Sequence, residues 1–262
     1  MADDKIRFED GAGYEKMMGK WSQLAGERFL DWLAPPRGLR WVDVGCGNGA
    51  FTELLVNRCA PASVLGVDPS EGQLAFARTR PASRLARFEP GDAMALPLAD
   101  ASVDAAVMAL VIFFVPDPAK GIAEMVRVAR PGGSVSAYAW DILDGGFPLA
   151  PLQEELRAIG TTPMLPPSVE AARLDALRES WTRAGMESVE TTQITVQRTY
   201  DGFEDFWETS LLGSSVGPKV KSLPPADVGL IRQRLRARLA PDAAGRITCS
   251  GRANAVKGRV PK

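Results

Sequence analysis

A short apolar segment that runs directly into three closely spaced glycines is the feature that most constrains the fold of this 262-residue chain. Residues 40–44 have the composition of a buried strand, and Gly45, Gly47 and Gly49 follow at once. A glycine has no Cβ, so the backbone can bend sharply there and lie directly against a ligand. Apolar side chains then recur at helical spacing. The segment predicts a strand, a tight turn and a helix whose free N–H groups face the turn.

Strand-like and helix-like segments continue to alternate as far as about residue 140, which is typical of parallel strands joined by crossover helices. Later segments at residues 189–197 and 247–256 resemble two more strands. The predicted fold class is α/β: a Rossmann-like, seven-stranded, mostly parallel sheet with helices on both faces and an inserted helical lid. Besides residues 40–44, the strands of the first half are expected at residues 63–67, 85–89, 103–111 and 134–140.

Two sequence signals mark the starts of crossover helices. Ser70 precedes Gln73 by three positions, as in a capping box. Asp117 is followed by Pro118, which is typical of an N-cap and the first helical position. We therefore expect Ser70 and Asp117 to cap two of the helices.

The chain is predicted to form a single domain over residues 1–262. Residues 38–140 hold the regular alternation of strands and helices and are expected to bind the cofactor. Residues 141–182 and 200–241 combine loops with short helices. We expect these two segments to form a lid over the substrate.

The charge balance and the missing residue types exclude several classes of function. Lys and Arg total 31 against 32 Asp and Glu, so we expect no nucleic-acid partner, which would require a basic surface. The chain has no histidine, which removes Ser-His-Asp catalysis and the usual zinc sites, and no metal is expected.

Hydropathy and cysteine usage bear on the compartment. No apolar run approaches the roughly 18 residues of a membrane helix, and the charged N-terminus lacks a secretory signal. We therefore expect no membrane partner. Cys46, Cys59 and Cys249 are too few and too widely spaced for a disulfide framework or a metal knuckle. A reducing, cytoplasmic location fits this pattern best.

Two acidic residues follow neighbouring predicted strands. Asp68 lies 21 residues after Gly47, where a dinucleotide-type fold places the carboxylate that holds a ribose diol. An aspartate at a strand end is more often a helix cap, but Ser70 takes that role here and leaves Asp68 free. Asp92 follows the third strand, where it is either an acceptor for an adenine amino group or a plain turn residue.

The spacing of the glycines separates two adenosine-containing cofactors. NAD-binding loops have the pattern G-x-G-x-x-G, which leaves room for a pyrophosphate. Here the glycines fall at positions 45, 47 and 49, and Asp43 precedes the first of them by two residues. S-adenosylmethionine (SAM) has no phosphate but carries an ammonium group, which loop carbonyls and a nearby acid suit better. The loop therefore favours SAM over NAD.

Several segments of the chain resemble the class I SAM-dependent methyltransferases, in the branch of the ubiquinone and menaquinone biosynthesis enzymes (methyltransferase type 11). Residues 14–22 resemble the N-terminal segment of many members of that branch, and residues 110–118 resemble the motif after their fourth strand. The resemblance implies transfer of a methyl group from SAM to a small-molecule acceptor, by an in-line displacement driven mainly by positioning. The other matching segments are residues 42–51, 64–70, 91–97, 103–118 and 131–141.

The resemblance also implies the cofactor contacts. In it, Asp43 orients the glycine loop or the amine of SAM, Asp68 holds the ribose hydroxyls, and Asp92 with Ala93 meets the adenine edge. Residues 1–33 cover the cofactor. The implied cofactor-binding residues are Tyr14, Trp21, Asp43, Gly45, Cys46, Gly47, Asp68, Pro69, Gln73, Asp92, Ala93, Ala109 and Leu110.

The acceptor site is expected at the carboxyl ends of the fourth and fifth strands. Phe113, Phe114 and Trp140 are candidates for its aromatic walls, although core packing explains such residues as well. No catalytic residue is identified, and Asp141, directly after Trp140, is only a weak candidate for a general base. Members of the family often have histidine where this chain has Phe113, so this chain manages without that group.

Two alternatives to an active methyltransferase stay open. One is a non-catalytic SAM-binding module, which only the replacement of the common histidine by Phe113 supports. The other is an NAD-dependent oxidoreductase, which the glycine spacing disfavours. The sequence also leaves open the acceptor and its reacting atom (O, N, C or S), the pathway, and the oligomeric state, a homodimer included.

Overall fold

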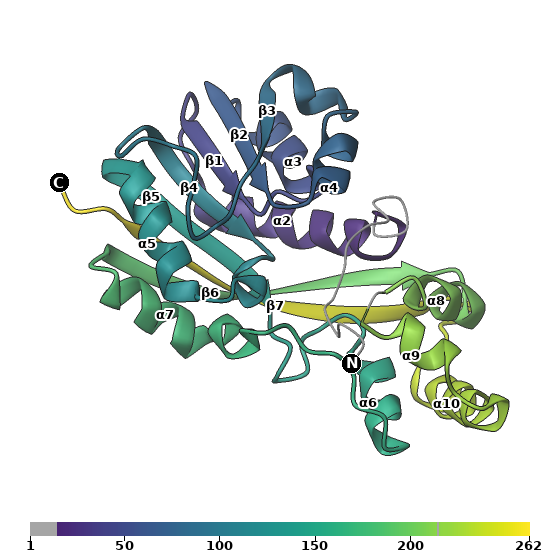
Figure 1. The fold of residues 1–262 in the computed structure, drawn as a ribbon. Coiled ribbons are helices and arrows are strands. Elements are labelled where there is room, and N and C mark those ends of the chain that lie inside the picture. The colour runs from purple at the N-terminus through teal and green to yellow at the C-terminus, as the bar shows by residue number, and fades with distance from the viewer. Residues whose placement is uncertain (1–14, 214) are drawn as a thin grey trace.

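The computed structural model describes residues 15–213 and 215–262 (Figure 1). Its strands are β1 (Arg40–Val44), β2 (Ser63–Asp68), β3 (Ala86–Pro90), β4 (Val103–Ala109), β5 (Ala129–Trp140), β6 (Glu187–Tyr200) and β7 (Ile247–Arg259). They form one seven-stranded sheet in the order β3-β2-β1-β4-β5-β7-β6. Strand β7 is antiparallel to β5 and β6, and the other neighbours pair in parallel. The predicted α/β Rossmann-like sheet is therefore confirmed.

Helices cover both faces of this sheet. The α-helices are α2 (Lys20–Leu33), α3 (Ala50–Cys59), α4 (Glu71–Ala77), α5 (Pro118–Val128), α6 (Ala150–Ala158), α7 (Leu174–Arg183), α8 (Phe203–Ser210), α9 (Gly217–Lys221) and α10 (Pro225–Arg238). Short turns of other helix types are η1 (Glu15–Gly19), η2 (Pro81–Arg84), η3 (Ile112–Phe114) and η4 (Val169–Ala172). Helices α2 and α3 pack together on one face, and α5 and α7 lie on the other (Figure 1). No helix within the described ranges is long and apolar enough to cross a membrane.

The local sequence signals account for the central elements. Nearly every residue of β1 and β4 is buried, as expected for parallel strands covered on both faces. The Ser70 hydroxyl accepts a hydrogen bond from the Gln73 amide at 3.4 Å and caps α4. Asp117 accepts from the Lys120 amide at 3.1 Å and caps α5, whose first residue is Pro118. Both predicted caps are confirmed.

Strand β5 begins at Ala129, earlier than the predicted start at residue 134. The strand is locally irregular at Gly132, which has a φ of 72°. Its amide donates to the Val260 carbonyl at 2.9 Å, and the Val260 amide donates to the Gly133 carbonyl at 2.9 Å. Strand β5 therefore continues through these two glycines, because they pair with Val260, the residue after β7. Helices α2 and α9 were not predicted.

The long β6–β7 pair carries a second group of helices. The connection between these two strands holds α8, α9 and α10, which gather with α6 beyond the carboxyl end of β6 (Figure 1). Helix α7 has a different place, although the sequence groups residues 174–182 with the lid. Its Trp181 side chain is fully buried and donates through Nε1 to the Val135 carbonyl at 3.0 Å. Helix α7 therefore covers the sheet, and α6 and α8–α10 form the separate helical group.

Candidate functional site

A cavity of about 590 Å³ lies at the carboxyl ends of the central strands. Segments that follow β1, β2, β3 and β4 line it, which is the edge where open α/β sheets bind their ligands. Most of the predicted cofactor residues therefore meet at one place. The predicted residues that line the cavity are Gly45, Cys46, Gly47, Asp68, Pro69, Gln73, Asp92, Ala93, Ala109 and Leu110, together with Phe114.

The glycine loop borders this cavity with bare backbone. Gly45 has a φ of 73°, and a Cβ there would lie 2.5 Å from the side chain of Val111. Gly47 has a φ of 51°, but a Cβ there would meet no atom within 4 Å, because its open side faces free space. The amides of Gly45 and Cys46 donate to the Val67 carbonyl at 2.7 and 3.0 Å, which fixes the loop to the end of β2. The loop thus leaves room for a ligand beside Gly47.

Asp68 faces the glycine loop from the end of β2. One carboxylate oxygen accepts from the Gly47 amide at 2.9 Å, and the other accepts from the Ser70 amide at 2.9 Å. Partial burial raises the pKa of Asp68, and the two backbone hydrogen bonds oppose that shift. Each carboxylate oxygen retains a further lone pair, so the group can also accept from ligand hydroxyls. The carboxylate lines the cavity and is held in place before any ligand arrives.

The third predicted acid lies at the outer rim of the same cavity. Asp92 is exposed, and one carboxylate oxygen accepts from the Met94 amide at 2.8 Å. The neighbouring Gly91 packs closely on β2, because a Cβ there would lie 2.7 Å from Val67. Asp92 and Ala93 therefore stand at the cavity edge without filling it.

Asp43 is placed differently from the other predicted cofactor residues. It is completely buried beneath the loop, is absent from the cavity lining, and accepts from the Thr52 hydroxyl at 2.6 Å. Burial raises the pKa of Asp43 to about 7; the Thr52 hydrogen bond opposes this shift, and the nearby Asp68 charge adds to it. Asp43 joins β1 to the first turn of α3. Any action on a ligand is therefore indirect.

The N-terminal segment reaches the glycine loop through a charged contact that sequence reasoning missed. Glu15 accepts from the Asn48 side chain at 2.8 Å and from Arg80 at 2.6 Å. Arg80 also donates to the Asn48 carbonyl at 2.6 Å and to Glu53 at 2.9 Å. Asn48 was within reach of prediction because it lies between two loop glycines. Glu15 and Arg80 are distant in sequence, and no spacing pattern links them to the loop.

The two aromatic residues predicted to cover the cofactor have different outcomes. Tyr14 lies outside the residues that the structure describes. Trp21 is fully buried, is not among the residues that line the cavity, and donates through Nε1 to the Tyr200 hydroxyl at 3.2 Å. Ser22, the next residue of α2, does line the cavity. Helix α2 thus approaches the site, but Trp21 serves its packing against β6.

A smaller cavity of about 60 Å³ adjoins the large one. Phe113, Phe114 and Trp140 all line it, as the sequence predicts for the aromatic walls of an acceptor site. Leu110 and Phe114 line both cavities and form the boundary between them. The structure therefore brings the predicted cofactor and acceptor residues to adjacent spaces.

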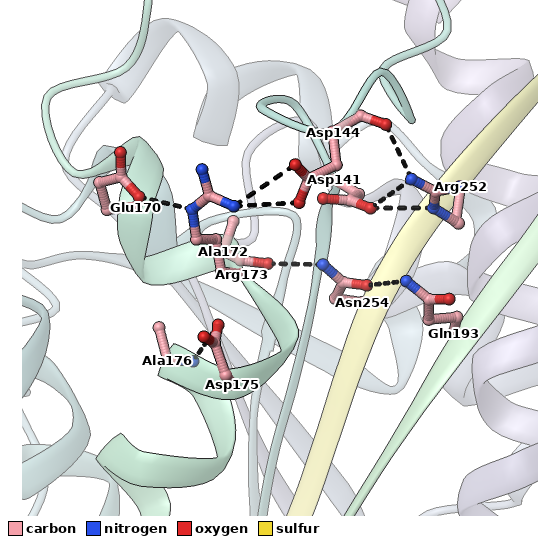
Figure 2. Close-up of polar contacts among 10 residues, drawn as sticks. All are labelled: Asp141, Asp144, Glu170, Ala172, Arg173, Asp175, Ala176, Gln193, Arg252 and Asn254. Atoms are coloured by element: carbon pink, nitrogen blue, oxygen red, sulfur yellow. Dashed lines mark hydrogen bonds and ion pairs between the residues drawn. The ribbon is translucent and has the colours of Figure 1, made fainter.

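Asp141, the weak candidate for a general base, lines neither cavity. Its buried carboxylate accepts from Nε and Nη2 of Arg252 at 2.8 and 2.7 Å, and Arg252 also donates to the Asp144 carbonyl at 2.8 Å (Figure 2). This paired carboxylate joins the end of β5 to β7. Asp141 is therefore a structural residue that ties the end of β5 to β7.

Comparisons with known proteins agree with this geometry. Residues 42–137 match the model of the methyltransferase domain family. A malonyl-[acyl-carrier protein] O-methyltransferase of Methylococcus capsulatus is 34% identical over 176 residues, which cover 60% of this chain and 62% of that protein. The enzyme of the same name from Pectobacterium atrosepticum is 31% identical over 150 residues, which cover 53% and 58%. The chain thus spans about three fifths of the length of these two relatives.

Solved structures resemble the whole fold. A putative methyltransferase from Bacillus halodurans has a TM-score of 0.59 at 17% identity, over 90% of this chain and 99% of that one. Phosphoethanolamine N-methyltransferase 2 of Haemonchus contortus, in complex with SAM, has a TM-score of 0.59 at 18% identity, over 99% of this chain and 59% of that one. At such identities the likeness establishes the fold.

Proposed function

We propose that the chain is a class I SAM-dependent methyltransferase that binds SAM in the large cavity and transfers the methyl group to an acceptor in the adjoining apolar cavity. The match of residues 42–137 to the methyltransferase domain family supports this proposal. The observation that carries the proposal is the meeting of Asp68 with the Gly47 amide at the edge of the large cavity. The second cavity begins at Leu110 and Phe114, where the first one ends. When bound, SAM supplies a methyl group on a sulfonium, which is the electrophile of the reaction.

The residues around the large cavity suit SAM better than a dinucleotide. Asp68 is oriented to accept from ribose hydroxyls, and Asp92 at the rim is placed for an adenine amino group. The open side of Gly47 accommodates the methionine part against bare backbone. No described lining residue is a lysine or an arginine, the side chains that would neutralise a pyrophosphate. This donor and acceptor set supports SAM and gives no support to NAD.

The described residues act mainly by position in this proposal. The described residues that line the smaller cavity include no carboxylate and no lysine, and the chain has no histidine. Holding two reactants in line contributes roughly 7–11 kcal/mol to lowering a barrier. The aromatic and aliphatic walls exclude water and surround a reaction whose positive charge is dispersed in the transition state. We therefore assign orientation and water exclusion, rather than proton transfer, to Leu110, Phe114 and Trp140.

A second candidate acceptor follows from the names of two relatives. Both are malonyl-[acyl-carrier protein] O-methyltransferases. If this chain shared that acceptor, it would methylate a carboxylate carried by a small protein. The malonyl carboxylate is a charged acceptor, whereas the described lining of the smaller cavity is mostly apolar.

Titration calorimetry with the Asp68→Ala variant tests the proposed site. We expect SAM to bind the unchanged protein and to bind the variant about tenfold more weakly, which corresponds to about 1.4 kcal/mol for one lost charge-assisted contact. Asp117→Ala is the matched control, because it also removes an aspartate that accepts a backbone amide next to a helix. Equal SAM affinity in both variants, or binding of NADH without binding of SAM, would contradict the assignment.

Turnover separates an enzyme from a non-catalytic module. Incubation of the protein with SAM and a metabolite extract is expected to yield S-adenosylhomocysteine (SAH), measured by mass spectrometry. The Asp68→Ala variant should yield less at a SAM concentration near the dissociation constant. SAM binding without turnover in any extract would favour the non-catalytic module.

A further inference from the structure

Among the residues that the structure describes, none that lines the smaller cavity has a charged side chain. All of its described residues are apolar except Gln153 and Ser215. Four aromatic rings, those of Phe113, Phe114, Trp140 and Phe147, contribute to the walls, and methionines fill the gaps between them. A carboxylate or phosphate placed there would lose its water without gaining a cation.

Four arginines near this cavity have other partners. Arg252 on β7 pairs with Asp141, the residue after the lining residue Trp140 (Figure 2). Arg198 donates to the carbonyl of Met17, a lining residue, at 2.8 Å. On α10, Arg234 pairs with Glu155 at 3.7 Å, and Arg238 pairs with Glu154, so these arginines fasten α10 to α6. None of these four arginines lines the cavity.

Gln153 is a buried polar side chain in this wall, beside the indole of Trp140, whose Nε1 has no hydrogen-bond partner among the described residues. Gln153 lies on α6, is 2% exposed, and its carboxamide has no hydrogen-bond partner among the described residues. A buried polar group without a partner destabilises a protein unless a ligand or water satisfies it. A carboxamide offers both a donor and an acceptor but no charge. The described lining thus presents only neutral hydrogen-bonding groups, the Gln153 carboxamide, the Trp140 indole N–H and the Ser215 hydroxyl, in an apolar surround.

From this lining we infer that the methyl acceptor is a neutral molecule with an apolar, ring-containing body and a polar atom that hydrogen-bonds the Gln153 carboxamide. The inference rests on the proposed function, because it assigns the acceptor of that same site. It favours a small neutral acceptor over the carboxylate of a malonyl thioester. Aromatic walls favour a ring in the acceptor, because contact between two aromatic rings stabilises a complex by more than the burial of their surface alone.

The boundary residue Leu110 gives the acceptor its direction. Leu110 has a φ of 63°, a conformation that few residues other than glycine adopt, and its amide donates to the Tyr138 carbonyl at 2.8 Å. The strained residue ends β4 between the two cavities and lines both. An acceptor whose body lies in the smaller cavity therefore has one end directed past Leu110 toward the larger cavity. The nucleophilic atom belongs at this end.

The transfer step balances without a protein base. The bond between the methyl carbon and sulfur breaks, and its electron pair stays on sulfur as the new bond from the acceptor atom to the methyl carbon forms. A proton on the acceptor atom then leaves to water. Because no described residue of the smaller cavity can take that proton as a base, the nucleophile must react in its neutral form. An aromatic amine nitrogen, which is uncharged near neutral pH, fits this requirement.

The outer wall limits the size of the acceptor. Leu165 lies in this wall and is 42% exposed, so it marks the rim of the cavity. The wall is tied down at Ser168, whose amide donates to the Phe113 carbonyl at 3.0 Å and whose hydroxyl donates to the Val115 carbonyl at 2.7 Å. With a volume of about 60 Å³, the cavity is smaller than the roughly 150 Å³ that holds one benzene. The acceptor ring therefore also occupies the boundary with the larger cavity at Leu110 and Phe114.

Three matched probes test the inference: 4-aminobenzyl alcohol and 4-hydroxybenzyl alcohol, which are neutral and carry a polar group at each end of the ring, and the anion 4-aminobenzoate. Calorimetry first establishes that SAH binds, because failure at this point refutes the proposed function itself. The SAH-bound protein is then titrated with each probe. We expect both neutral probes to bind at least tenfold more tightly than the benzoate. Benzoate binding as tight as that of the neutral probes, or no binding of either neutral probe, would overturn the inference.

Two substitutions at residue 153 locate the effect. Gln153→Met should weaken binding of the neutral probes about tenfold and leave SAH affinity unchanged, whereas Gln233→Met, the same change on the exposed part of α10, should alter neither. Gln153→Lys should reverse the preference toward the benzoate. If the lysine variant loses SAH binding through misfolding, the methionine variant decides alone. Unchanged probe affinity in Gln153→Met would contradict the assignment.

Discussion

The two adjoining cavities are built in different ways. Backbone forms much of the larger cavity, because Gly45, Gly47 and the amides held by Asp68 shape its edge. Side chains form the smaller one, and they come from η1, η3, β5, α6, the segments after β4 and β5, and the loops before η4 and α9. This difference indicates that substitutions can change cofactor binding and acceptor specificity separately. Substitutions in the loop should damage the first, and substitutions in the apolar wall should alter the second.

The largest expected effect concerns Asp43, which is buried beneath the cofactor loop. Its pKa rises from 3.8 to about 7 in the folded protein, so between these values the folded state holds a proton that the unfolded state has released. The free energy of unfolding should therefore fall as the pH rises from about 4 to about 7. The integrated loss is roughly 4 kcal/mol, at about 1.4 kcal/mol for each pKa unit.

Urea unfolding of the unchanged protein and of Asp43→Asn at several pH values isolates this contribution. The asparagine keeps an oxygen that accepts from Thr52 but has no titration. We expect the variant to gain stability relative to the unchanged protein as the pH rises, and the gain to level off above about pH 7. Parallel stability curves for the two proteins would show that Asp43 does not titrate in this range.

The next effect compares two glycines of the same loop. Gly45→Ala places a Cβ 2.5 Å from Val111 at a positive φ, whereas Gly47→Ala has a positive φ but free space. The backbone cost is roughly 1–2 kcal/mol in each, and overpacking adds about 1–3 kcal/mol in Gly45→Ala alone. Thermal unfolding should therefore show the larger loss for Gly45→Ala. Equal losses would mean that Val111 moves aside without cost.

The smallest effect tests the contact between the N-terminal segment and the loop. Arg80→Gln removes the charge that links Glu15, Asn48 and Glu53. We expect SAH to bind about fivefold more weakly, which is about 1 kcal/mol, and the neutral acceptor probes to bind the SAH-saturated variant as before. Arg58→Gln is the control, because Arg58 pairs with Asp31 at 2.7 Å away from the loop. A similar loss in both variants would indicate a general effect of charge.

The cofactor side of the site was predictable because its residues follow strand ends at short and regular spacings. Gly45, Gly47, Asp68 and Asp92 lie at successive strand ends, and a parallel sheet brings such ends to one edge. The same reasoning could not place Trp21, since the residue type does not show whether an indole faces a ligand or packs against β6.

The acceptor side was less predictable for a physical reason. Its wall combines Met17, Gln153, Met164 and Ser215, which tertiary packing brings together from separate segments of the chain. The pairing of Asp141 with Arg252 spans 111 positions and was equally hidden, so the acid looked available as a base. Aromatic residues near the end of β4 and β5 were found only because they follow those strands directly.

The most direct test of the account is a crystal structure of the protein with SAH and 4-aminobenzyl alcohol. The account predicts the SAH ribose at Asp68, the aniline ring among Phe113, Phe114 and Trp140, and its nitrogen directed past Leu110 toward the SAH sulfur. An SAH ribose remote from Asp68, or an aniline bound outside the smaller cavity, would contradict it.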